Sequence, residues 1–220
     1  MHLYVLPGAC SLASHIAFEV VAESAPNDFQ YQVTVVERGR NHEAPYIEIN
    51  PCGSVPALVT SDGRLILESV AVLLHIADAN PHARIAPAIG EATRDRLHYL
   101  LSLMVTTGHT AFQMLWRSER FTDTPEAHSS LQRMCEARLG LLFERLEREL
   151  APNRFLVGER LGVADMYLFV LCRWGLRLGR PTTTYPNLWR FAEDVAGIPA
   201  VRNAMAREGI ALQGPSAGLG

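Results

Sequence analysis

A cysteine stands where a predicted strand passes into a predicted helix near the start of the chain. The apolar run 2–6 is typical of a short buried strand, a Pro-Gly pair interrupts it, and apolar residues recur at helical spacing from Ser11. Cys10 therefore lies at a predicted helix N-terminus, where free backbone N–H groups and the helix dipole favour a thiolate. We expect a lowered pKa for this thiol. Because Ala13 stands where a C-x-x-C pair needs its second cysteine, redox work here would require an external thiol.

Three further positions carry groups able to bind a ligand, and each also has a structural interpretation. Pro56 begins a predicted strand, where proline is tolerated, but it also turns the N–H and C=O of Val55 outward toward an added peptide strand. Glu68 and Ser69 open a predicted helix, where they serve as caps or offer a hydroxyl and free N–H groups to a carboxylate. His109 lies in another predicted helix, and a lone helical histidine is often structural. The residues alone leave these alternatives open.

The composition excludes several classes of function. The net charge is −3 and all 20 basic residues are arginine, so the chain has neither broad affinity for nucleic acid nor a lysine for Schiff-base or phosphate-loop chemistry. No apolar stretch is long enough to span a membrane, and no secretory signal is recognisable. The four cysteines are dispersed and the histidines lack metal-ligand spacing, so we expect reduced thiols, no metal and a cytoplasmic protein.

The element pattern predicts two domains. Residues 1–80 follow the order β-α-β-α-β-β-α, which favours a mixed sheet covered by helices. A proline-containing linker follows over 81–90, and 91–208 shows helical periodicity only, beginning with one long helix predicted over 91–120. The glycine-rich residues 209–220 are predicted to form a flexible tail.

Motifs spread over nearly the whole chain resemble the glutathione transferases, and specifically their bacterial beta class with an N-terminal cysteine. The matching segments are Leu3-Tyr4, Pro7 to Leu12, Asn50 to Leu58, Leu67 to Ser69, Gly162 to Leu168 and Tyr185 to Leu188. The resemblance implies an α/β thioredoxin-like N-terminal domain, an all-α C-terminal domain and a homodimer.

The resemblance also implies roles for individual residues toward glutathione as cosubstrate. Val55 would pair its backbone with the cysteinyl part, with Pro56 in cis, while Glu68 and Ser69 would hold the γ-glutamyl end. Arg38 would reach the glycyl carboxylate. Two further contacts are expected from Ser11 and Ser102, and His109 is expected to line the active site.

The expected activity is therefore that of an enzyme that conjugates the glutathione thiolate to small hydrophobic electrophiles. Cys10 would donate a hydrogen bond to that thiolate or form a mixed disulfide, and His109 would polarise the second substrate. An apolar cleft walled by Met104, Phe112 and Trp116 would hold this substrate. Two alternatives stay open: thiol–disulfide exchange as the main activity, or a catalytically silent glutathione-binding or regulatory protein.

Overall fold

The N-terminal part of the chain forms a four-stranded mixed sheet in the computed structural model, which describes residues 1–213. Its strands are β1 (His2–Val5), β2 (Gln32–Val35), β3 (Ala57–Val59) and β4 (Leu65–Leu67). Their order is β2-β1-β3-β4, with β1 and β2 parallel and the other pairs antiparallel. Along β1, buried residues alternate with half-buried ones, as the period of two in a strand requires when one face carries most of the core.

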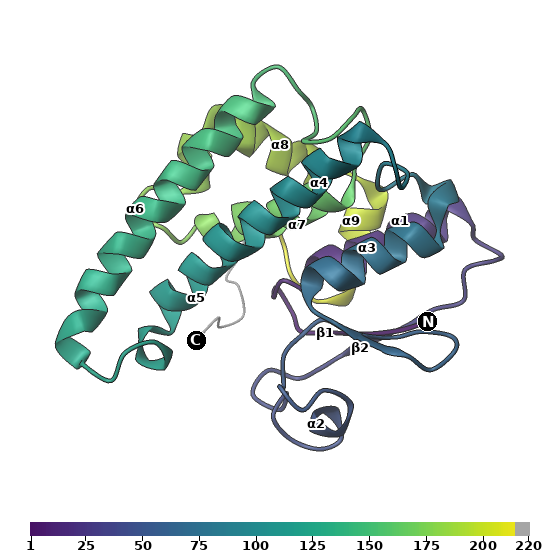
Figure 1. Cartoon of the computed structure of the whole chain (residues 1–220), viewed down its shortest axis with the longest axis horizontal. Coiled ribbons are helices and arrows are strands. Elements are labelled where there is room, and N and C mark those ends of the chain that lie inside the picture. Colours follow the sequence, from purple (N-terminus) through teal and green to yellow (C-terminus); the bar gives the residue numbers. More distant parts are fainter. Residues whose placement is uncertain (214–220) are drawn as a thin grey trace.

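Helices cover both faces of this sheet (Figure 1). Helices α1 (Leu12–Ser24) and α3 (Ser69–Ala79) pack together on one face, where apolar residues of both helices join the main core. The short helix α2 (Tyr46–Ile49) lies on the other face, where Tyr46 packs with Tyr4. This arrangement confirms the predicted thioredoxin-like order of elements.

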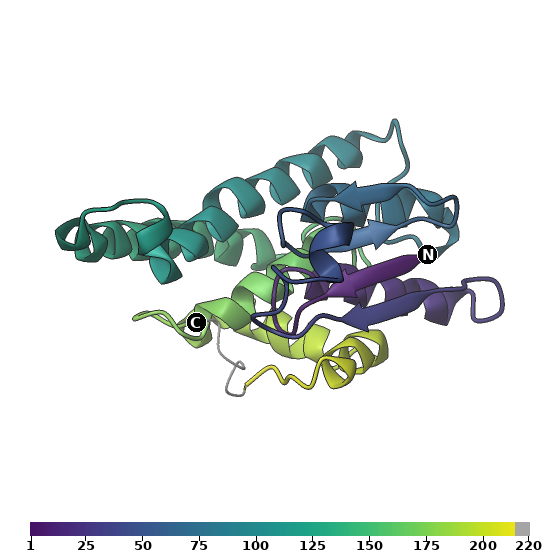
Figure 2. The same cartoon turned by 90° about the horizontal axis from the view of Figure 1, so that it is seen from below.

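After α3, the described chain is helical and contains no strand. The helices are α4 (Ala92–Leu103), α5 (Thr110–Trp116), α6 (Pro125–Leu150), α7 (Val163–Gly175), α8 (Pro186–Ala196) and α9 (Pro199–Arg207). Helix α7 is buried along its whole length, which explains its continuous apolar sequence. Seen from below, it lies between the outer helices and the sheet domain (Figure 2).

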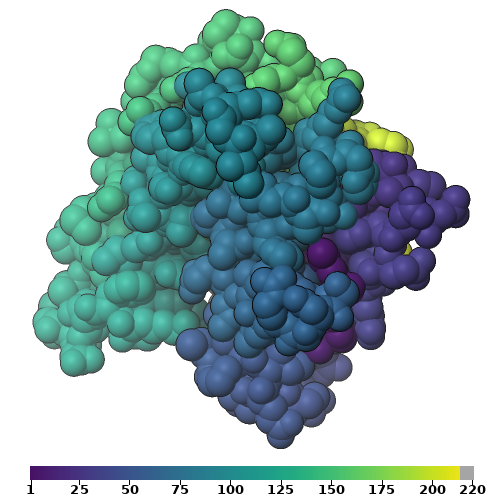
Figure 3. Space-filling view, turned by 45° about the vertical axis from the view of Figure 1, so that its right-hand side comes forward, coloured from purple at the N-terminus to yellow at the C-terminus, as the bar shows by residue number. Residues whose placement is uncertain are grey.

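The two parts of the chain pack against each other over a wide area. Helix α1 contacts both α7 and α9, so one core runs from the sheet into the helical part. The space-filling view shows the blue residues of the N-terminal part lying directly against the teal residues of the helical part (Figure 3). Side chains from both parts can therefore meet at one site.

The helix predicted over 91–120 is interrupted. Between α4 and α5, Met104–His109 forms a π-helical turn, and a short 3₁₀ turn follows at Ser118–Arg120. Gly108 explains part of this local packing, because a Cβ atom there would lie 2.8 Å from Leu142 Cδ2. A π-helical turn shifts the direction of the side chains that follow it, and such turns are frequent at functional sites.

The end of the described chain also differs from the prediction of a flexible tail over 209–220. Ile210 donates its N–H to the Met205 carbonyl at 3.0 Å. The carbonyl of Ala211 accepts hydrogen bonds from Arg173 Nε at 3.2 Å and Nη2 at 2.9 Å. Residues 209–211 are thus held against the helical domain, and residues 214–220 of the predicted tail lie outside the described residues.

Candidate active site

The loop between β1 and α1 is closed by Ser11. The Ser11 hydroxyl accepts a hydrogen bond from the Leu6 N–H at 3.0 Å and donates to the Leu6 carbonyl at 3.4 Å. Ser11 is fully buried, and both hydrogen bonds return to the loop itself. The Ser11 side chain therefore shapes the loop and does not line the cavity beside Cys10, in contrast to the position expected of a ligand contact.

Cys10 is held in this loop as a buried thiol. Its Sγ donates a hydrogen bond to the Val55 carbonyl at 3.2 Å. Burial raises the pKa of Cys10 to about 11; the Glu68 carboxylate also raises it, and a hydrogen bond from Ser69 lowers it. The free thiol is thus neutral at pH 7, and the prediction of a lowered pKa was wrong.

The N-terminus of α1 favours the Cys10 thiolate, but too weakly to lower the pKa overall. The backbone N–H groups of Cys10 and Ser11 hydrogen-bond to the sulfur and lower its pKa. Desolvation of the buried sulfur is the larger effect, so the pKa rises.

The turn before Cys10 is clamped by the helical domain through Gly8, a residue with φ +70°. Glu208 Oε2 accepts the Gly8 N–H at 2.9 Å, and Trp174 Nε1 donates to the Gly8 carbonyl at 2.9 Å. The other carboxylate oxygen of Glu208 accepts from His15 Nδ1 at 2.9 Å. We call Glu208 and Trp174 the Gly8 clamp. It fixes the turn in a left-handed conformation that glycine adopts at little cost.

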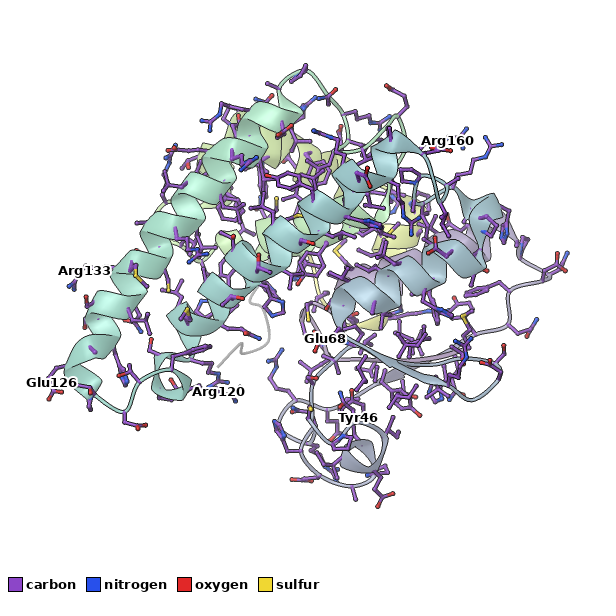
Figure 4. All side chains as sticks on the ribbon, in the orientation of Figure 1. Tyr46, Glu68, Arg120, Glu126, Arg133 and Arg160 are labelled. Carbon is purple, nitrogen blue, oxygen red and sulfur yellow. The ribbon has the colours of Figure 1, made fainter. Side chains whose placement is uncertain are left out.

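A cavity of about 730 Å³ opens beside Cys10, between the sheet domain and the helical domain. Of the residues that the sequence singles out, those lining this larger cavity are Cys10, Arg38, Val55, Pro56, Glu68, Ser69 and His109. Glu68 lies on the sheet side of the opening and Arg120 on the helical side, beyond α5 (Figure 4). The structure therefore brings together seven of the predicted positions.

The backbone at Val55 is presented to this cavity. The Val55–Pro56 peptide bond is cis, which agrees with the resemblance. The Val55 carbonyl accepts the Cys10 thiol, and the Val55 N–H has no hydrogen-bond partner within residues 1–213. A peptide-like ligand can pair with this segment as an added strand.

Glu68 and Arg38 bring opposite charges to the lining of the larger cavity. Glu68 precedes α3 with φ +72°. This backbone conformation is strained for residues other than glycine, and such residues are frequent at functional sites. Arg38 donates from Nη2 to the Pro7 carbonyl at 2.8 Å, and its Nε is buried without a partner within the described chain. Burial lowers the pKa of Arg38, and the charges of Arg117 and Arg177 lower it further.

His109 lies where the larger cavity meets a second one. Its Nδ1 is 2.7 Å from the Tyr167 hydroxyl, and Nε2 is 3.3 Å from Gln113 Nε2. Burial lowers the pKa of His109 to about 4, so the ring is neutral at pH 7. A neutral imidazole can exchange hydrogen bonds with a substrate but carries no fixed positive charge.

The second cavity, of about 160 Å³, is mainly aromatic. Phe112, Trp116 and Trp174 supply its rings, with the Trp174 ring 5.4 Å from Phe112 and 5.5 Å from Trp116 between centroids. Arg38 and Arg117 also line this aromatic cavity, as do Cys10, His109 and Gln113. The predicted roles of Phe112 and Trp116 thus agree with their positions.

Two other predicted residues lie elsewhere. Met104 is fully buried in the core and lines neither cavity. Ser102 is exposed on α4 and lines neither cavity; its carbonyl accepts the Thr106 hydroxyl at 2.8 Å. Within one chain, neither residue therefore lines the cavity in which it was predicted to act.

Four residues of the site were missed by reasoning from the sequence: Trp174, Glu208, Tyr167 and Arg117. Tyr167 and Trp174 lie on the apolar helix α7, where the sequence pattern predicts core residues, and Glu208 follows α9 without a local motif.

No group of three metal-ligating side chains occurs within residues 1–213. In the same range, no helix is both long and apolar enough to cross a membrane.

Comparison with known proteins identifies the fold and the family. The chain matches two family models, "Glutathione S-transferase, N-terminal domain" over 27–79 and "Glutathione S-transferase, C-terminal domain" over 103–199. Glutathione S-transferase GstA of Escherichia coli O157:H7 is 30% identical over 210 residues, which cover 96% of this chain and 100% of the relative.

Two solved structures agree with this match. A sphingomonad glutathione S-transferase complexed with glutathione has 32% identity and a TM-score of 0.82, covering 96% of this chain and 100% of its own. The bacterial beta class glutathione S-transferase of Sphingomonas chungbukensis has 31% identity and a TM-score of 0.82, and the match again covers 96% of this chain and 100% of its own. This chain therefore belongs to the glutathione S-transferase family of enzymes, and within it to the bacterial beta class.

Proposed function

We propose that the protein binds glutathione in the larger cavity, and the observation that carries this proposal is the unpaired Val55 N–H beside the Cys10 thiol. The Val55 N–H and C=O offer one donor and one acceptor, which match the carbonyl and N–H of the cysteinyl residue of the tripeptide. Pairing in this register brings the glutathione sulfur close to Cys10.

Charged groups match the two ends of the tripeptide. The Ser69 hydroxyl and the first N–H groups of α3 suit the γ-glutamyl carboxylate, and the Glu68 carboxylate suits its ammonium group. Arg38 suits the glycyl carboxylate, because Pro7 anchors one of its nitrogens and its buried Nε still lacks a partner within the described chain.

The reaction that we propose is conjugation of glutathione to a small hydrophobic electrophile. The glutathione thiol gives its proton to water, and the thiolate attacks the substrate carbon that bears a halide. A C–S bond forms, the C–halogen bond breaks, and the halide leaves with the bonding electron pair. When the cysteinyl N–H of glutathione takes the Val55 carbonyl, the S–H of Cys10 is released from that acceptor. Cys10, kept neutral by a pKa of about 11, then donates its S–H hydrogen bond to the attacking thiolate. Neutral His109 donates or accepts a hydrogen bond at the second substrate.

Thiol–disulfide exchange is the second candidate, and the observation that favours it is the Cys10 sulfur lining both cavities. Exchange requires Cys10 as a thiolate that attacks a disulfide. Because burial raises the pKa of Cys10, this step is disfavoured at pH 7, and conjugation is the better supported activity.

Calorimetry with glutathione and two activity assays test these proposals. Wild type, Cys10→Ala and the control Cys135→Ala, whose cysteine lies in the core, would be assayed with a chloronitroaromatic and with a mixed disulfide of glutathione. Removing one hydrogen bond to a thiolate should slow conjugation by about tenfold, since such a bond contributes about 1.5 kcal/mol. If Cys10→Ala instead loses only the thiol–disulfide exchange activity, Cys10 is the nucleophile of the exchange reaction. Heat of binding without turnover of either substrate would favour a silent binding protein, and no heat at millimolar glutathione would refute the binding proposal.

We also propose that the protein acts as a cytoplasmic homodimer, as the resemblance implies. Light scattering during size-exclusion chromatography tests the dimer, since a mass near 24.3 kDa would contradict it.

A further inference from the structure

Guanidinium groups gather around the aromatic cavity. Arg38 and Arg117 line it, while none of its lining residues is acidic. Arg177 does not line it, but the guanidinium carbon of Arg177 is 5.3 Å from the centroid of the Trp116 ring, which does. Aromatic rings and cations thus share one small site.

These cations lack close carboxylate partners. Arg117 Nη1 is 4.0 Å from Glu119 Oε1, and both side chains are partly exposed, so this pair is weak. Arg177 forms no ion pair within residues 1–213. Arginines elsewhere do have close partners, such as Arg180 at 2.7 Å from Glu144.

The crowding of like charges has an electrostatic cost. Burial lowers the pKa of Arg38 most, and Arg117 and Arg177 lower it further, which shows that each of these cations repels Arg38. An anion bound among them would relieve this repulsion. In the proposed function, the glycyl carboxylate of glutathione occupies Arg38, which leaves Arg117 and Arg177 for a second anionic group.

The size of the aromatic cavity indicates what carries this group. Its volume of about 160 Å³ is close to that of an engineered apolar cavity of about 150 Å³ that binds benzene. One substituted aromatic ring therefore fits against Trp116 and Trp174. A ring substituent directed toward Arg117 would meet a guanidinium fork that suits carboxylate and sulfonate oxygens.

We propose that the second substrate is an aromatic electrophile that carries a carboxylate or sulfonate, with the ring in the aromatic cavity and the anionic group on Arg117 and Arg177. This inference rests on the proposed conjugation and specifies its substrate class. The glutathione sulfur forms a C–S bond at the halogen-bearing ring carbon, the halide leaves with the bonding electron pair, and the thiol proton goes to water. The anionic group takes no part in bond making and serves for binding.

A matched pair of substrates tests the inference. At saturating glutathione, kcat/KM would be measured for 4-chloro-3,5-dinitrobenzoate and for the neutral 4-chloro-3,5-dinitrobenzamide, each divided by its uncatalysed rate. We expect the enzyme to favour the anion by about tenfold, and Arg117→Gln to remove most of this preference, because a charge-assisted hydrogen bond is worth about that factor. A higher salt concentration should also reduce the preference of the wild-type enzyme for the anionic substrate, because salt screens the attraction between the arginines and the anionic group.

Arg133→Gln is the control, because it removes the same charge from the outer side of α6, away from both cavities (Figure 4). Its ratio of the two kcat/KM values should equal that of the wild type. Equal efficiency of wild type toward anion and amide would overturn the inference. So would a raised KM for glutathione in Arg117→Gln with the ratio unchanged, since Arg117 would then serve glutathione.

A binding measurement keeps the inference testable even if no conjugation occurs. With S-methylglutathione present, quenching of tryptophan fluorescence gives the Kd of 3,5-dinitrobenzoate and of 3,5-dinitrobenzamide. Absence of turnover with both substrates would refute the proposed function, whereas about tenfold tighter binding of the benzoate, lost in Arg117→Gln, would still support the anionic site. Equal Kd values for the two rings would refute that site.

Discussion

Replacing Glu208 tests how strongly the helical domain holds the turn before Cys10. The Glu208 side chain is completely buried and accepts two hydrogen bonds of 2.9 Å, from the Gly8 N–H and from His15 Nδ1. In Glu208→Ala both donors remain buried without an acceptor. Each such loss costs about 1–3 kcal/mol, so the variant should lose about 2–6 kcal/mol of unfolding free energy.

Glu208→Gln separates the hydrogen bonds from the shape of the side chain. The amide keeps one acceptor oxygen but places an NH₂ group against the second donor, so we expect a loss of about 1.5–3 kcal/mol. For a chain of this size, 1 kcal/mol shifts the melting temperature by about 2–4 °C. The alanine variant should therefore melt roughly 5–20 °C below wild type, and the glutamine variant should lie between the two.

Thermal unfolding followed by circular dichroism at pH 7 measures these shifts. Glu126→Ala is the matched control, because Glu126 is exposed at the start of α6 (Figure 4) and contributes less than about 1 kcal/mol through the helix dipole. An alanine variant that melts within about 1 °C of wild type would refute this account of the clamp. A glutamine variant less stable than the alanine variant would refute the role given to the remaining oxygen.

Three other predictions follow from the structure. Because the pKa of Cys10 is about 11, only about one thousandth of this thiol is ionised at pH 8. Iodoacetamide should therefore label the exposed Cys52 before Cys10, and mass spectrometry can follow both positions. Faster labelling of Cys10 would contradict its burial. The folded protein takes up a proton on His109 only near pH 4, whereas the unfolded chain does so near 6.5, so stability falls as the pH drops between these values. His109→Gln should flatten that slope in urea titrations, and an unchanged slope would contradict the burial of the ring. Gly175→Ala should lower the free energy of unfolding by about 1–3 kcal/mol, because the new Cβ would clash with Thr182 and Phe143. Gly140→Ala, whose Cβ would have its nearest atom 3.9 Å away, should stabilise α6 by up to about 1 kcal/mol. Denaturant titrations measure both changes, and equal effects would contradict the packing.

Much of the fold and part of the site follow from local sequence signals. The strand-to-helix turn places Cys10, the proline before β3 places Val55, and the start of α3 places Ser69. Each position depends on neighbours within a few residues, so turn chemistry and periodicity are sufficient to find it. The structure then brings the three to one cavity because parallel and antiparallel pairing aligns their strands.

The remaining features depend on contacts that no local pattern contains. The pKa of Cys10 was predicted in the wrong direction, because desolvation of its sulfur depends on tertiary packing and outweighs the backbone N–H groups that lower the pKa. Met104 was misplaced because helical periodicity marks an apolar face but does not tell whether a residue on it faces the core or a cleft. Trp174 and Glu208 reach the site from distant helices, so only the folded structure shows the Gly8 clamp.

The Gly8 clamp has a consequence for biosynthesis. Gly8 and its hydrogen-bond acceptor Glu208 are 200 positions apart, so the ribosome makes the acceptor long after the turn has emerged. At about 5–20 residues per second, this delay lasts about 10–40 s. During that time the nascent turn lacks the carboxylate that holds it. The turn before Cys10 therefore acquires its complete set of hydrogen bonds only after the last helix has been translated.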